Sequence, residues 1–157
     1  PQLEQTLRSK QVDVAAVGHW QATFDGTIRK NGGVRTIFTD TEILGEIAVC
    51  FIVLHRDFIK EHPKAVQVFV EQAGRAADWA RENPQLAKEK FAEILKRRGE
   101  NTEIAQFWTG FGLRPGAQPV ARDVDFWVDV LEREGALPKG KYTSENFLYK
   151  SENYQAK

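Results

Sequence analysis

The chain has 157 residues, of which 41% are hydrophobic and 28% are charged, close to the composition of an average globular domain. Its 10 Phe, 4 Trp and 3 Tyr argue against disorder, and its equal numbers of acidic and basic residues (22 each) argue against a nucleic-acid or anionic-membrane surface. No apolar run approaches the roughly 20 residues of a membrane span. A single cysteine, Cys50, excludes an internal disulfide and a cysteine-based zinc site.

Two features predict that the sequence is part of a longer protein. It contains no methionine, even at its first position, and Pro1 leads directly into helix-like sequence. It also shows no signal peptide, which a processed or truncated chain would have lost.

The first third of the chain alternates predicted helices and strands. A short helix is expected over residues 2–10, and the apolar, β-branched run 12–17 predicts a strand buried on both faces. Apolar residues recur every four positions over 20–31 and predict a helix that the glycine pair 32–33 ends. Residues 34–38 then predict a second strand.

The longest apolar run, residues 47–54, predicts a central strand. Strand, helix and strand in this order predict a parallel βαβ unit. Because the run holds Cys50, that thiol is expected to be a buried and inert small hydrophobe. We expect His55 and His62 to be turn or cap residues, since no metal-ligand spacing surrounds them.

After residue 57 the chain is predicted to be mostly helical. Four helices are expected to begin near residues 63, 84, 101 and 124, several with Pro or Asn at the start. Asp125 and Asp129 fall on the polar side of the fourth helix, which Gly135 closes. Residues 111–119 are expected to form a loop, and residues 141–157 a polar surface tail.

Two glycine-rich stretches resemble nucleotide-binding motifs. Residues 135–142 nearly match a phosphate-binding loop, but Tyr142 stands where a short hydroxyl is needed, and a helix precedes the stretch. Residues 110–116 resemble a dinucleotide fingerprint with one residue too many, and they also follow a helix. We interpret the first as a helix end and the second as a loop.

The turn formed by Gly18, His19, Trp20 and Gln21 is the strongest candidate for a ligand site. It lies at the carboxyl end of a predicted strand, where free N–H groups of the next helix favour anions. Gly18 allows close backbone approach, His19 can donate to an oxyanion, and Trp20 offers a flat apolar wall. The alternative is that Trp20 packs in the core and His19 only caps the helix.

The order of these segments resembles a known family. The stretches LRSKQVDVAAVGHWQATF, GGVRTIFTD and GEIAVCFIVLHRDFIKEHPKAVQVFVEQAGRAADWARENP look like the second half of a solute-binding protein of an ABC importer. The later stretch VDFWVDVLEREGALPKGKYTSENFLY resembles the same family's C-terminal helices. The family includes nitrate-, taurine- and alkanesulfonate-binding proteins and pyrimidine-precursor binders.

The resemblance implies an α/β fold of the two-lobed, type II periplasmic-binding-protein class, of which this chain is the C-terminal half. Residues 1–45 would end the second lobe, and residues 46–157 would supply a hinge strand and the helices that complete the first lobe. The family's cleft residues come from strand-to-helix turns and the hinge. The matching positions here are the turn from Gly18 to Gln21 and, near the returning strand, Glu46.

The function implied is capture of a small anionic or polar solute, such as a sulfonate, nitrate, taurine or a pyrimidine. The loaded protein would then meet an ABC permease in the periplasm or, membrane-anchored, at the outer cell surface. No catalytic residue, metal or cofactor is expected. Two alternatives stay open: an enzyme or binder of the thiamine pyrimidine pathway on the same scaffold, and a docking module. An isolated half is expected to expose apolar edges and to self-associate.

Overall fold

The chain divides into two compact units. The computed structural model describes residues 2–17, 28, 30–110, 112 and 114–149. One unit combines residues 1–39 with 83–110, and the other combines residues 40–82 with 111–157. The chain therefore passes from the first unit to the second, back again, and once more to the second.

In the first unit, helix α6, Pro84–Arg97, packs against the 3-10 helix η2, Thr102–Phe107. Pro84 suits the first position of α6 because its missing N–H would have no partner there. Asn101 caps η2, accepting a 2.9 Å hydrogen bond on its side-chain oxygen from the N–H of Glu103. The same unit contains helix α1, Gln2–Arg8.

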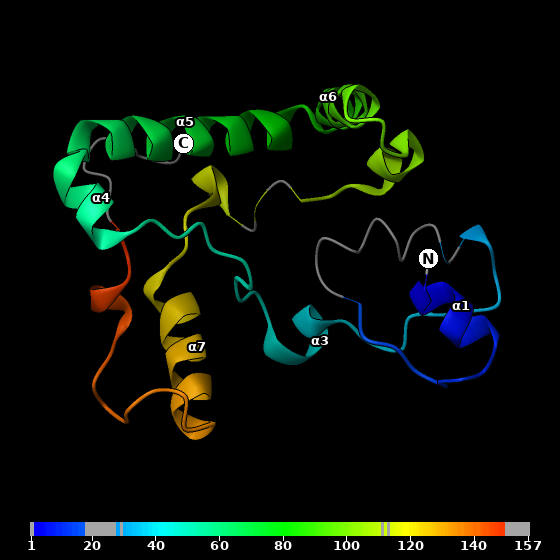
Figure 1. Ribbon diagram of the computed structural model, residues 1–157, viewed down its shortest axis with the longest axis horizontal. Helices are drawn as coiled ribbons and strands as arrows, with labels where there is room; N and C mark the ends of the chain where they lie inside the picture. The colour runs from blue at the N-terminus through cyan, green and yellow to red at the C-terminus, as the bar shows by residue number, and fades with distance from the viewer. Residues whose placement is uncertain (1, 18–27, 29, 111, 113, 150–157) are drawn as a thin grey trace. The chain divides into compact units, whose positions relative to one another are not determined.

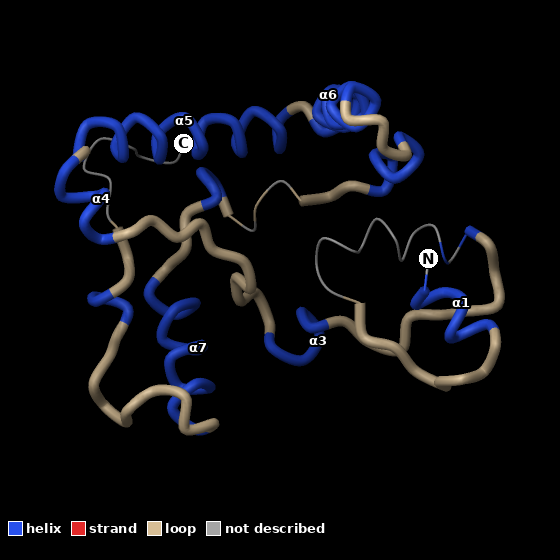
Figure 2. The backbone as a smooth tube through the Cα atoms, in the orientation of Figure 1, coloured by secondary structure: helices blue, strands red, loops and turns tan. Residues whose placement is uncertain are grey.

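Figures 1 and 2 show the helices of the second unit, which among its described residues are four α-helices and two short 3-10 helices. They are α3 (Asp40–Leu44), α4 (Arg56–Glu61), α5 (Pro63–Glu82), η3 (Pro115–Ala117), α7 (Ala121–Arg133) and η4 (Ser144–Asn146). The longest, α5, lies against η3. Val66 of α5 is fully buried, and Ala80 is 8% exposed.

Polar side chains from the end of α5 hold the loop that leads to α7. Asp78 accepts a hydrogen bond on Oδ1 from the backbone N–H of Gly116. Arg81 donates from Nη2 to the carbonyl oxygens of Gly112, at 3.0 Å, and of Arg114. Because these backbone groups are satisfied, the loop, which includes η3, is fixed relative to α5.

The helices predicted over residues 2–10 and after residue 57 are confirmed, and the helix predicted over residues 20–31 lies largely outside the described residues. Helices begin at Pro63 and Pro84, and the predicted fourth helix is α7. The third is the tighter η2. The chain is thus mostly helical after residue 57, as predicted.

The three predicted strands are not strands in the part of the chain that the structure describes. Residues 12–17, 34–38 and 47–54 form irregular connections, and Figure 2 draws helices and loops but no strand. A strand exists only when a neighbour completes its hydrogen-bond ladder, and no described segment pairs with these residues. The βαβ unit is therefore not seen among the described residues.

The apolar run 47–54 is consequently more exposed than the sequence predicted. Ile52 is 72% exposed and Val53 is 85% exposed, while Ile47, at the start of the run, is buried. Cys50 is also exposed, so the expectation of a buried thiol was wrong. Self-association through such apolar edges, and the division into lobes at residue 45, stay predictions.

Gly45 marks the point where helix α3 ends and this run begins. Its φ of 72° lies in the left-handed region that favours glycine, and its N–H donates to the carbonyl oxygen of Thr41 at 2.9 Å. A Cβ at this position would meet only the Nη2 of Arg122, at an ordinary 3.7 Å. Any penalty for a side chain at residue 45 therefore comes from its backbone conformation, not from crowding.

Replacing Gly45 by alanine is expected to lower the free energy of unfolding by about 1–2 kcal/mol, because alanine is strained at positive φ. Chemical denaturation followed by tryptophan fluorescence measures this loss. Gly45→Asn is the matched control and should lose less, since asparagine tolerates the left-handed region better. Equal stability of the wild-type and alanine chains would contradict the assigned turn.

Candidate functional site

Of the predicted site residues, the structure places Glu46. Gly18, His19, Trp20 and Gln21 lie outside the described residues, so the predicted turn stays a prediction. Glu46 follows directly after the turn at Gly45, and its side chain is exposed. Its backbone belongs to a polar cluster in the second unit that the sequence did not predict.

The centre of this cluster is Asp123, the third residue of α7, which is completely buried. Its Oδ2 accepts a 2.8 Å hydrogen bond from the backbone N–H of Val120, just before the helix. Asp123 thus caps α7 in the manner of an acidic residue at the third helical position. Val120 has no side-chain oxygen with which to return the bond.

The same carboxylate also holds the segment that follows Glu46. Its Oδ1 accepts a 3.0 Å hydrogen bond from the N–H of Ala48. Trp127, one turn further along α7, donates from Nε1 to the carbonyl oxygen of Ala48 at 2.8 Å. Both backbone groups of Ala48 are therefore bound to side chains of one helix.

Arg114 completes the cluster with a two-pronged ion pair. Its Nη1 lies 2.6 Å from Oδ2 of Asp123, and its Nη2 lies 3.1 Å from Oδ1. The same Nη2 donates to the carbonyl oxygen of Glu46 at 2.8 Å. A planar guanidinium suits this arrangement because it presents several N–H donors in a fixed geometry. We call the side chains of Arg114, Asp123 and Trp127 the Asp123 cluster.

The surroundings of Asp123 keep it ionised. Burial by itself would raise the pKa of this carboxyl. The N–H groups of Val120 and Ala48 and the guanidinium of Arg114 outweigh burial, so that the pKa lies below the ordinary value of 3.8. The cluster therefore carries a buried but compensated pair of charges.

The remaining sequence candidates have structural explanations. His55 caps α4, accepting a 3.3 Å hydrogen bond on Nδ1 from the N–H of Asp57, and His62 is its C-cap, as predicted. Gly135, with a φ of 74°, ends α7 as predicted. The described residues contain no group of three or more His, Cys, Asp or Glu side chains placed to hold a metal ion.

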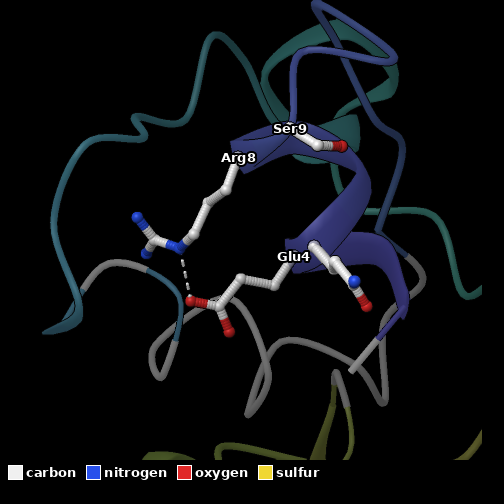
Figure 3. Close-up of a pocket in the computed structure, with 4 residues that line it drawn as sticks. Glu4, Arg8 and Ser9 are labelled. Atoms are coloured by element: carbon white, nitrogen blue, oxygen red, sulfur yellow. Dashed lines mark hydrogen bonds and ion pairs between the residues drawn. The ribbon is translucent and has the colours of Figure 1, made fainter.

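A shallow hollow on α1 is lined by Glu4, Gln5, Arg8 and Ser9 (Figure 3). The Arg8 guanidinium points toward the Glu4 carboxylate, with Nε and Oε1 2.8 Å apart. The side-chain amide of Asn31 donates to the same Oε1 at 3.0 Å. These two hydrogen bonds hold the pKa of Glu4 below its usual value, and the bond from Asn31 has the larger effect. The charged groups of this hollow already bind one another, which argues against a solute site there.

Replacing Asp123 by asparagine is expected to lower the free energy of unfolding at neutral pH by about 2–4 kcal/mol, since Arg114 loses its counter-ion and an amide N–H faces a backbone N–H. Because the folded-state pKa is depressed, this contribution is present above pH 3.8 and disappears as the pH falls through that lower pKa. The stability difference between wild type and variant should therefore shrink in acid.

Urea denaturation at a series of pH values measures both effects. Asp129→Asn is the matched control on the same helix, because Asp129 is 63% exposed and its ion-pair partner among the described residues is Arg133, four residues on. Its loss should be below about 0.5 kcal/mol. If both variants lost a similarly small part of the free energy of unfolding, the hydrogen bonds and ion pair of Asp123 would not be essential for stability.

Comparisons with known proteins identify the family. The model of the NMT1-like family matches residues 1–96, which is more than half of the chain. No curated protein and no solved structure matches significantly. No helix among the described residues is long and apolar enough to cross a membrane. The chain belongs to the NMT1-like family, the family of nitrate-, taurine- and sulfonate-binding solute-binding proteins of ABC importers.

Proposed function

We propose that this chain belongs to the solute-binding component of an ABC importer and captures a small anionic or polar solute. The observation that carries the proposal is membership of the NMT1-like family, whose typical role is solute binding and not catalysis. The matched residues include both parts of the predicted site, the turn from Gly18 to Gln21 and Glu46. A solute bound between two lobes, with the division at residue 45, is part of the same proposal.

The proposed mechanism is binding followed by delivery, with no bond made or broken. The two lobes of a type II binding fold close on the solute, and the closed form meets an ABC permease at the membrane. Such a protein works in the periplasm or at the outer cell surface. Affinity for the closed form must exceed affinity for the open form, because only a difference in affinity drives closure.

The chemistry of the proposed site favours one class of solute. N–H groups of the turn at Gly18 and the imidazole of His19 would bind an anionic group, and Trp20 would cover an apolar part. The exposed carboxylate of Glu46 has no hydrogen bond or ion pair with another described residue. A carboxylate repels a simple anion such as nitrate but attracts an ammonium group. We therefore place amine-bearing sulfonates, of which taurine is the simplest probe, ahead of nitrate.

Trp20 provides the first test. Trp20→Ala is expected to weaken binding of the preferred solute by about 1–3 kcal/mol, because the apolar wall is lost. Calorimetric titration with nitrate, taurine, ethanesulfonate and a pyrimidine identifies that solute. Trp20→Phe should retain most of the affinity because a flat ring remains. Unchanged affinity in the alanine variant would remove Trp20 from the site, and turnover of a solute would favour the enzyme alternative.

Glu46 provides the second test, using two solutes that differ only in an amine. Glu46→Gln is expected to weaken taurine binding by about tenfold, the size of a charge-assisted hydrogen bond, and ethanesulfonate binding by less than about twofold. Glu42→Gln, a change of the same charge on α3, is the control for net charge. Equal loss for both solutes would mean that Glu46 does not contact the amine.

A further inference from the structure

Glu46 is the one described residue of the proposed site, and its backbone is held on both sides. Before it, the turn at Gly45 is closed by a 2.9 Å hydrogen bond to Thr41. At and after it, the Asp123 cluster binds the carbonyl oxygen of Glu46 and both backbone groups of Ala48, at 2.8 to 3.0 Å. Such attachment leaves the main chain at residue 46 little freedom.

Residues 49–53, which follow Ala48 in the apolar run, lack such bonds to the rest of the described chain. No hydrogen bond joins the backbone of residues 49–53 to another described residue. The side chains of Ile52 and Val53 are largely exposed. The Asp123 cluster therefore holds Glu46, which the proposed function requires, and Ala48, at the start of the run whose residues 49–53 have no such bonds with other described residues. Stability of α7 alone would need only the bond from Val120 to Asp123.

We infer that Arg114, Asp123 and Trp127 are positioning residues, which fix the main chain at Glu46 and thereby the point from which its exposed carboxylate reaches the solute's amine. This inference rests on the proposed function. Because the main chain at residue 46 is already ordered before binding, less entropy is lost when the solute arrives. The cluster should thus raise affinity for an amine-bearing solute without touching that solute.

Trp127 is the best residue for a test because its replacement by phenylalanine is mild. Trp127→Phe removes the N–H that binds the Ala48 carbonyl and keeps an aromatic ring beside Phe126, whose ring lies edge-on at 5.1 Å. Asp123 itself is too deeply buried to be a clean probe. Arg114→Lys is a second variant. It retains the positive charge but lacks the guanidinium, whose N–H groups bind the Asp123 carboxylate and the Glu46 carbonyl at the same time.

The experiment titrates the full chain with taurine and with ethanesulfonate by calorimetry. Trp127→Phe and Arg114→Lys are each expected to weaken taurine binding by roughly three- to tenfold, the range for one lost hydrogen bond, and ethanesulfonate binding by less than about twofold. In a Glu46→Gln background, Trp127→Phe should cause no further loss, because the positioned carboxylate is gone. Trp79→Phe, on α5 of the same unit, is the control.

The outcomes separate this inference from the proposed function. If Glu46→Gln discriminates between the solutes but Trp127→Phe does not, or if their effects simply add, the positioning role is wrong and the proposed site stands. Equal losses for both solutes in Trp127→Phe would indicate a merely structural role. If neither solute binds, or if Glu46→Gln changes nothing, the proposed use of Glu46 fails and the inference fails with it.

Discussion

The buried carboxylate of Asp123 is the interaction on which the second unit depends. It accepts four hydrogen bonds, two from the guanidinium of Arg114 and one each from the N–H groups of Val120 and Ala48. Burying a charge is unfavourable unless it is paired and fully hydrogen-bonded, and here both conditions are met. One side chain thereby joins the start of α7, the loop before it, and the run after Glu46.

In a sheet, the backbone of a neighbouring strand would satisfy the N–H and C=O groups of this segment. Here side chains satisfy those of Ala48. The apolar run 47–54 has the composition of a central strand, yet no described residue completes a ladder beside it. Its first residues are fixed by Asp123 and by Trp127, and its later residues are exposed. This contrast gives the Asp123 cluster its significance, because the cluster fixes Glu46 and the first residues of the run that follows it.

The helices could be predicted from the sequence because their signals are local. Pro63 and Pro84 start helices and Asn101 caps one, each through contacts within a few residues. The strands were predicted wrongly because a strand depends on a distant partner that composition does not reveal. The family could also be identified, since the order of many weak segments carries that information.

The Asp123 cluster could not be predicted because, like a strand, it depends on residues that are far apart in the sequence. Asp123 carries a recognisable cap signal, an acidic residue in the first turn of a helix, but the helical pattern placed only Asp125 and Asp129 on the polar side of α7. The bond from Ala48 to Asp123 spans 75 residues, and that from Arg114 to Glu46 spans 68. Nothing in a single sequence pairs such positions. Glu46 itself was proposed only through the family resemblance.

The ionisation of Asp123 is the most direct measurement of the central claim. Nuclear magnetic resonance of the Asp123 side-chain carboxyl carbon, followed as the pH of the folded protein is lowered, reports its pKa. Four N–H donors on a buried carboxylate require a titration midpoint below the ordinary 3.8. A midpoint at or above that value would mean that burial outweighs the donors, and would contradict the assigned role of the cluster.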